Sequence, residues 1–252
     1  MTDGSVCNPY PDLMAFGPGL GRLRASLKGR RKTRIVAIGS SSTSGEGNVI
    51  PYPHRLELAL RARFPDRMVD VINRGIGGQE APEEAARFES DVLLEEPALV
   101  IWQVGTNAIY HRELYDPARV AAAIAAGLSW LKTLEADIIL MDLQYAPELL
   151  TATLNECDRK DPQKQKAADA DRKAATLHMV ELIRQAATDA GVNLFRRFAL
   201  MQRWVEQDHI DIEKLINASD RLHQTEFGTA GVSNALYTAI KGAIGDIPGA
   251  AV

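Results

Sequence analysis

IVAIGSSSTSG, residues 35–45, joins a short apolar run to a turn of small hydroxyl side chains. A continuous apolar run of this kind is typical of a strand that is buried on both faces of a parallel sheet. The glycine and serines that follow it indicate a tight turn into a helix, and such a turn presents a hydroxyl at the end of the strand. The segment therefore predicts the first strand of an α/β sheet and a turn that is able to carry a serine nucleophile.

Similar strand-like runs recur along the chain, and a helical pattern separates each from the next. We expect strands at 34–38, 68–73, 99–103, 137–142 and 192–195, and helices at 20–27, 53–64, 83–94, 116–134, 166–190 and 226–240. Strands that alternate with helices predict a parallel sheet with helices on both faces. The predicted fold class is therefore a flavodoxin-like α/β/α sandwich in three layers around five parallel strands.

The chain is long enough to form one α/β domain with a sizeable core. We expect residues 1–33 to form an N-terminal arm and residues 34–252 to form a single domain. Residues 144–165 are the least regular stretch, and we interpret them as a loop over the site and not as a domain boundary. The oligomeric state is not predicted.

Composition excludes several classes of partner. Of the 252 residues, 46% are hydrophobic and 25% are charged, as in an ordinary soluble globular protein. The net charge of −4 gives no reason to expect nucleic acid or an anionic membrane as a partner. The basic cluster at 28–34 is interpreted as a solvated loop. No apolar run approaches the length of a transmembrane segment.

Location and redox state are predicted only by default. The first residues lack the apolar core of a signal peptide, so we expect a cytoplasmic protein, or a periplasmic or secreted one if a signal has been removed. Two cysteines, Cys7 and Cys157, do not make a disulfide framework. They could pair only if the N-terminal arm reaches the middle of the chain.

Small, polar or glycine-rich residues follow each of the first three expected strands. They are Ser40 and Ser41 after the first, residues 73–78 after the second, and residues 105–107 after the third. Ligands of parallel α/β sheets bind beyond the carboxyl ends of the strands. We therefore expect the functional site at this edge of the sheet.

The serine-rich turn has two rival interpretations besides a nucleophile. Its hydroxyls could simply cap a helix, or its glycines could bind phosphate in a flavodoxin-like nucleotide binder. The Walker phosphate loop requires a lysine after its last glycine, whereas Glu46 follows Gly45 and would repel phosphate. The α/β-hydrolase elbow G-x-S-x-G is also absent, because Thr43 occupies the place of its second glycine.

Asp220 and His223 form an Asp-x-x-His pair near the other end of the chain. Within a tight turn this spacing places both side chains on one side, so that the carboxylate can orient the imidazole as a base. The remaining histidines have no comparable partner. Zinc-ligand spacing is absent as well, so the sequence predicts no metal site.

Together, in this order, these segments resemble the SGNH (GDSL-type) hydrolase family from residue 34 to about residue 240. Gly39-Ser40-Ser41 resembles the Gly-Asp-Ser of its first block, and residues 73–78 resemble its second block. Residues 105–108 resemble the Gly-x-Asn-Asp of its third block, and residues 220–223 resemble its last block, Asp-x-x-His.

The resemblance implies a serine esterase that hydrolyses a carboxylic ester through an acyl-enzyme, without metal or organic cofactor. Ser41, Asp220 and His223 would be the catalytic triad. The oxyanion hole would consist of the Ser41 N–H, the Gly78 N–H and the Asn107 side chain. The substrate would be a small-molecule ester with a short acyl or O-acetyl group, an acylated carbohydrate being one candidate.

Two positions depart from the family pattern. Ser40 replaces the aspartate of the first block and becomes a rival nucleophile, although Ser41 occupies the family position. Ala108 replaces the aspartate of the third block. Neither replaced residue is a triad member in the family, so the two replacements do not exclude the chemistry.

Two alternatives to a hydrolase stay open. An O-acyltransferase would use the same triad, and a non-catalytic carbohydrate- or lipid-binding module would keep only the fold. Substrate contacts are expected from rim residues after the third and fourth strands, namely Tyr110, His111, Gln144, Tyr145 and Pro147, for which ordinary loop packing is the alternative. No long aliphatic stretch lies near the motifs, and this favours short acyl chains.

Overall fold

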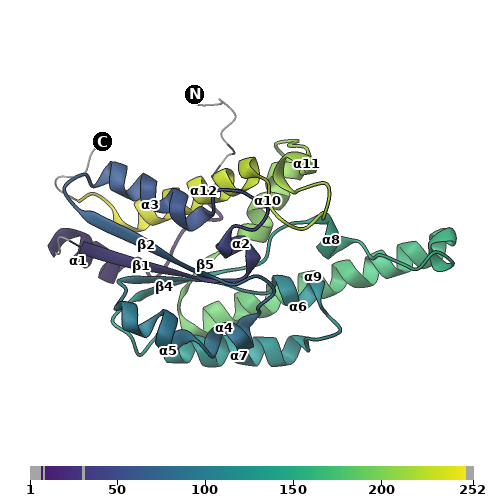
Figure 1. Ribbon diagram of the computed structural model, residues 1–252, viewed down its shortest axis with the longest axis horizontal. Helices are drawn as coiled ribbons and strands as arrows, with labels where there is room; N and C mark the ends of the chain where they lie inside the picture. The colour runs from purple at the N-terminus through teal and green to yellow at the C-terminus, as the bar shows by residue number, and fades with distance from the viewer. Residues whose placement is uncertain (1–6, 8, 30–31, 248–252) are drawn as a thin grey trace.

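A five-stranded sheet forms the centre of the protein, whose computed structural model describes residues 7, 9–29 and 32–247 (Figure 1). All neighbouring strands are parallel, and their order is β2-β1-β3-β4-β5. The strands are β1 (Lys32–Gly39), β2 (Met68–Gly75), β3 (Leu99–Gln103), β4 (Asp137–Met141) and β5 (Asn193–Phe195). The predicted fold class is confirmed.

Helices cover both faces of the sheet (Figure 1). One face carries α3 (Tyr52–Arg63) and α12 (Glu226–Ile244), and the other carries α7 (Pro117–Leu131) and α9 (Pro162–Ala190). Capping residues determine where α7 and α9 begin and where α9 ends. The side chains of Asp116 and Asp161 accept hydrogen bonds from backbone N–H groups of the first turn, and a proline follows each aspartate. Gly191 ends α9 in the left-handed conformation.

The helix predicted at 83–94 is wrong as a single element. It is divided into α4 (Ala81–Ala85), α5 (Phe88–Asp91) and the 3₁₀ turn η1 (Leu93–Glu95). The chain leaves helical geometry at Arg87, where φ is −109° and ψ is 13°. The Arg87 side chain there donates to the Gln79 side chain at 2.7 Å and to the Gly39 carbonyl at 3.3 Å, both in the turns after β2 and β1.

Other differences lie in the connections. Residues 144–165, expected as a loop, contain α8 (Pro147–Leu150), the 3₁₀ turn η2 (Asp158–Lys160) and the first residues of α9. The sequence analysis also did not expect α6 (Thr106–Tyr110), α10 (Arg197–Glu206) and α11 (Ile212–Leu215). The amino-terminal part of α9 and the turn before it project from the body of the molecule (Figure 1).

The described part of the N-terminal arm packs against the domain. It forms α1 (Gly21–Gly29), and Leu20, Leu23 and Leu27 are buried in the common core. The Leu23 N–H donates to Asp137 Oδ2 in β4 at 2.8 Å. Residues 1–6, 8, 30 and 31, which belong to the predicted arm, lie outside the described residues, and the domain boundary at residue 34 stays a prediction.

The expected solvated loop at 28–34 is wrong for its described residues, because α1 extends to Gly29 and β1 begins at Lys32; Arg30 and Arg31 lie outside the described residues. Cys7 is buried, Cys157 is exposed, and both are free thiols. Within the described residues, no helix has the length and apolar character needed to cross a membrane. The cytoplasmic location stays a prediction.

Candidate active site

Ser41 is the first residue of α2 (Ser41–Ser44), the short helix that follows β1. The turn before it is tightly packed: a Cβ at Gly39 would lie 2.5 Å from Thr43 Oγ1 and 3.0 Å from the Gln103 side chain. Only glycine fits there without displacing β3 or the turn itself. The Ser41 side chain is consequently fixed at the carboxyl end of β1, with little exposure to solvent.

Hydrogen bonds connect Ser41, His223 and Asp220 in a continuous chain. His223 Nε2 lies 3.0 Å from Ser41 Oγ, and His223 Nδ1 lies 2.9 Å from Asp220 Oδ2. Two residues separated by 182 positions in sequence are thus in direct contact. This is the relation that a serine nucleophile, its base and an orienting carboxylate require.

Asp220 is held as a carboxylate. Its Oδ1 accepts from the Leu222 and His223 N–H groups, both at 2.9 Å. Partial burial opposes ionisation of Asp220, but these two bonds and the imidazole outweigh it and lower the pKa of the carboxyl below its ordinary value. An ionised Asp220 favours the imidazole tautomer with hydrogen on Nδ1, which leaves Nε2 free to accept a proton from Ser41.

The segment after β4 fixes the turn that carries Asp220 and His223. Within this turn Arg221 has a left-handed backbone with φ of 57°. Its guanidinium donates to Thr151 Oγ1 at 2.7 Å, and its carbonyl accepts from the Glu148 N–H at 3.1 Å. Gln144 Nε2 donates to the Leu222 carbonyl at 3.3 Å. The strained turn is therefore stabilised from outside itself.

Gly78 lies on the turn after β2, and Asn107 is the second residue of α6, which follows β3; β2 and β3 are the two strands that flank β1. Gly78 has φ of 78° and no heavy atom within 4 Å of the position of a Cβ, so it faces open space. Asn107 is buried, and its Nδ2 donates to the Gln79 carbonyl at 2.7 Å. An amide nitrogen carries two N–H bonds, so Asn107 retains one for a further acceptor.

Two hydrogen bonds to backbone carbonyls also join the end of β1 and the residues after it to the end of β2 and the residues after it. The Ile76 N–H donates to the Gly39 carbonyl at 2.9 Å, and Asn73 Nδ2 donates to the Thr43 carbonyl at 2.8 Å. All five predicted site residues therefore lie at the carboxyl edge of the sheet. Side-chain hydrogen bonds join Ser41, His223 and Asp220. The hydrogen bond from Asn107 to the Gln79 carbonyl joins the segment after β3 to the turn of Gly78.

Glu80 is a site component that sequence reasoning missed. It is buried, and its carboxylate accepts from the backbone N–H groups of Ala81 at 3.0 Å, Gly105 at 2.8 Å and Ala108 at 2.9 Å. Burial raises the pKa of Glu80, and the backbone donors oppose this rise. The side chain joins the turn of Gly78 to that of Asn107. Its only sequence signal was its place directly after the second block.

Ser40, the rival nucleophile, points into the sheet. Its hydroxyl and its N–H both contact Gln103 Oε1 in β3, at 3.1 and 3.2 Å, and the residue is buried. The position that carries an aspartate in the family thus serves here to attach the nucleophile turn to β3. Ala108, the other departure, is fully buried beneath the third turn.

A second buried network supports the site through Gln144, which was expected at the rim but is fully buried. Its Oε1 accepts from Arg197 Nη2 at 2.9 Å and from Thr106 Oγ1 at 2.9 Å. Arg197 Nε also donates to the Asp142 carbonyl at 3.0 Å. Burial raises the pKa of the Asp142 carboxyl to about 7 and lowers that of Arg197 to about 10.

The other expected rim residues make ordinary packing contacts. Tyr145 is half-buried with its ring edge-on to Phe198, at 5.3 Å between centroids. Tyr110 is exposed and packs on the half-buried His111 at 4.5 Å. Pro147 begins α8. Among the described side chains, no cluster of three or more His, Cys, Asp or Glu is arranged to hold a metal ion.

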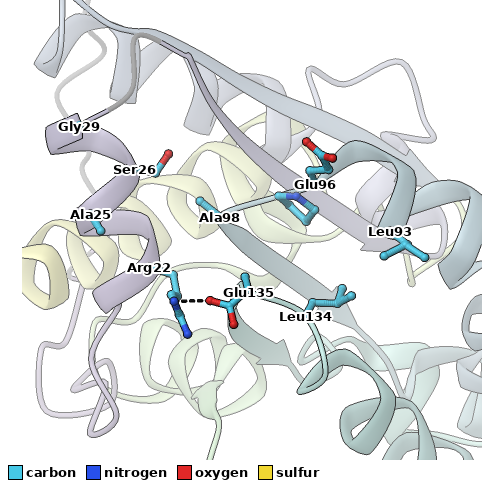
Figure 2. A pocket seen from close by; sticks show the side chains of 10 residues that line it. Arg22, Ala25, Ser26, Gly29, Leu93, Glu96, Ala98, Leu134 and Glu135 are labelled. Carbon is cyan, nitrogen blue, oxygen red and sulfur yellow. Dashed lines mark ion pairs between the residues drawn. The ribbon is translucent and has the colours of Figure 1, made fainter.

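A cavity of about 680 Å³ lies at the opposite end of the sheet (Figure 2). It is lined by residues that precede β3 and β4 and by α1, and Arg22 and Glu135 form an ion pair beside it. None of the five predicted site residues lines it.

Comparison with known proteins points to lipase-like enzymes. The Non-GDSL lipase-like family matches residues 6–159. The uncharacterized lipoprotein YqeF of Bacillus subtilis (strain 168) is 33% identical over 85 residues, which is 33% of this chain. That alignment spans only 35% of YqeF.

Solved structures share the fold. An acetylxylan esterase of Geobacillus stearothermophilus, Axe2, matches with a TM-score of 0.62 and 19% identity over 82% of this chain and 94% of that one. LAE5, an alpha/beta hydrolase from the metagenome of Lake Arreo, matches with a TM-score of 0.65 and 22% identity over 85% and 97%. Catalytic mutants of Axe2 replace a serine, a histidine or an aspartate by alanine.

Proposed function

The chain belongs to the Non-GDSL lipase-like family, and from this premise we propose that it is a serine esterase that hydrolyses a carboxylic ester through an acyl-enzyme. The observation that carries the proposal is the hydrogen-bonded chain from Asp220 through His223 to Ser41, with distances of 2.9 and 3.0 Å. Its location at the carboxyl end of a parallel sheet agrees with where such folds bind ligands.

In the proposed reaction Ser41 Oγ attacks the ester carbonyl while His223 Nε2 accepts its proton. His223 then returns the proton to the leaving alcohol, and Asp220 stabilises the imidazolium that exists between the two transfers. Water, activated by the same imidazole, releases the acyl group from Ser41. The lowered pKa of Asp220 supports this role, because the carboxyl remains ionised at neutral pH.

The tetrahedral oxyanion would accept hydrogen bonds from the Ser41 N–H, the Gly78 N–H and the second N–H of Asn107. A fixed donor of this kind typically contributes about 3–4 kcal/mol to stabilising the transition state. The Gln79 carbonyl already orients the Asn107 amide, and the space at the Cβ position of Gly78 is open.

For the substrate we propose an ester with a short acyl or O-acetyl group on a carbohydrate-like alcohol. Support comes from the sequence, in which no long aliphatic stretch lies near the site motifs. The fold neighbour Axe2, an acetylxylan esterase, points the same way.

Active-site labelling tests the nucleophile directly. Wild-type protein should react with a fluorophosphonate probe and hydrolyse p-nitrophenyl acetate, and Ser41→Ala should lose both, with turnover reduced by at least about a thousandfold. Ser40→Ala is the matched control, because it removes the neighbouring hydroxyl; it should still label. Labelling of Ser41→Ala but not of Ser40→Ala would overturn the assignment in favour of Ser40.

A further inference from the structure

Glu46 directly follows the nucleophile turn and faces the same imidazole nitrogen as Ser41. Its N–H donates to the Ser41 carbonyl at 3.3 Å, just after Gly45 ends α2 in the left-handed conformation. Its Oε2 lies 3.5 Å from His223 Nε2, the atom that lies 3.0 Å from Ser41 Oγ. The Glu46 side chain is about half exposed, at 48%. The carboxylate therefore lies on the solvent side of the reacting atoms.

The other oxygen of Glu46 lies against the second turn. A Cβ at Gly77 would be only 1.6 Å from Glu46 Oε1. Gly77 does not have a positive φ, so steric room and not backbone conformation explains glycine at this position. Glu46 consequently spans the gap between His223 and the residue before Gly78.

This position is where a leaving group must arrive. In the proposed reaction, His223 Nε2 transfers its proton to the oxygen of the departing alcohol, so that oxygen has to come within hydrogen-bonding distance of Nε2. The atoms attached to it then lie beside the Glu46 carboxylate. A hydroxyl on the adjacent carbon can donate to Glu46, whereas a negatively charged group there is repelled.

The charge around His223 is not balanced by a cation. Asp220 faces Nδ1 and Glu46 faces Nε2, so two carboxylates face one imidazole. Among the ion pairs of the described residues, Glu46 has no partner other than His223. Even with His223 protonated, the three side chains carry a net negative charge.

We infer that Glu46 is a specificity-determining residue, which favours esters whose leaving alcohol carries a neighbouring hydroxyl and rejects those whose leaving group is anionic. The inference rests on the proposed esterase function and concerns the alcohol side of the same site. Glu46 acts on the leaving group through its position as well as its charge, because Gly77 leaves room for it at the mouth of the site.

Three acetate esters of nearly equal size form the test: ethyl acetate, 2-hydroxyethyl acetate and acetoxyacetate. Their leaving groups are ethanol, ethylene glycol and the glycolate anion. Acid release is followed for wild type, Glu46→Gln and the charge-matched control Glu135→Gln, whose carboxylate lies at the far end of the sheet. Intrinsic reactivity cancels when each ester's kcat/KM is compared between proteins.

In Glu46→Gln, kcat/KM for acetoxyacetate relative to ethyl acetate should rise by about tenfold or more, since removing a like charge at this range restores the disfavoured partner. The preference for 2-hydroxyethyl acetate should fall by a few-fold, because a neutral amide is a weaker acceptor than a carboxylate. Glu135→Gln should leave both ratios unchanged.

Gly77→Ala separates position from charge, because its methyl group displaces the Glu46 carboxylate without removing it. We expect the ratios to shift in the same direction as in Glu46→Gln. Unchanged ratios in Glu46→Gln, or an equal loss for all three esters, would overturn the inference while leaving the esterase proposal intact. If wild-type protein hydrolyses no ester and does not label at Ser41, both proposals fail together.

Discussion

Replacement of Glu80 by glutamine tests whether one buried side chain holds the proposed oxyanion donors in place. The Glu80 carboxylate accepts from the N–H groups of Ala81, Gly105 and Ala108, the first two through Oε1 and the third through Oε2. A glutamine amide has one acceptor oxygen and one NH₂ group. At least one backbone N–H would therefore lose its acceptor and face another donor.

The expected magnitudes follow from these contacts. A buried donor without a partner costs about 1–3 kcal/mol, and relief from burying an ionisable carboxyl offsets part of this cost. We expect the free energy of unfolding to fall by about 1–2 kcal/mol. Complete loss of an oxyanion donor costs about a hundredfold or more in kcat, so a displaced Asn107 turn should lower kcat by about tenfold to a hundredfold.

Urea unfolding measures the first quantity, and steady-state hydrolysis of p-nitrophenyl acetate measures the second. Glu83→Gln is the matched control, since exposed Glu83 accepts from the Glu80 N–H at 3.2 Å and an amide oxygen can replace it; its effect should stay within about 0.5 kcal/mol. If Glu80→Gln matches wild type in both assays, Glu80 does not position the donors. A loss of stability with full kcat would limit it to a purely structural role.

Three further outcomes are expected. Asn107→Ala should lower kcat for p-nitrophenyl acetate by about a hundredfold with little change in KM, because the donor acts on the transition state; an equal rise in KM alone would contradict this. Asp220→Asn should keep the fold, as measured by circular dichroism, but lose at least about a thousandfold in kcat through the wrong imidazole tautomer, and a loss below tenfold would refute the role of Asp220. Between pH 3.8, the ordinary value, and about 7, the unfolded chain has lost the Asp142 proton while the native chain retains it. The free energy of unfolding should therefore fall with rising pH by about 1.4 kcal/mol per unit from this group, and Asp142→Asn should flatten that slope in urea titrations at several pH values.

The sheet was predictable from sequence because β1, β3 and β4 are largely buried on both faces. Continuous apolar runs such as residues 99–103 have few alternatives once helical patterns separate them, and the structure has β3 at that position. The helix at 83–94 was not predictable in detail. Its break at Arg87 depends on contacts with Gln79 and Gly39, which only the folded chain brings together.

The candidate site residues could be predicted from the sequence, but the buried side chains that hold them in place could not. The spacing of the motifs was enough to predict Ser41, Asp220 and His223 as candidates. Glu80, Arg197 and the burial of Gln144 do not, because a charged or amide side chain in a loop looks solvent-exposed until the fold surrounds it. Their partners are mostly backbone groups, which sequence does not display.

The order β2-β1-β3 separates the proposed site into two parts that can change independently in evolution. The proposed nucleophile and two of its proposed oxyanion donors follow neighbouring strands, lie within residues 41–107, and belong to the part of the chain that the family match covers. The proposed acid–base pair comes from one turn that is distant in sequence and outside that match, and hydrogen bonds to the segment after β4 hold this turn in place. A lineage could therefore exchange or retune the proton-transfer turn, and with it the working pH, while inheriting the oxyanion hole unaltered.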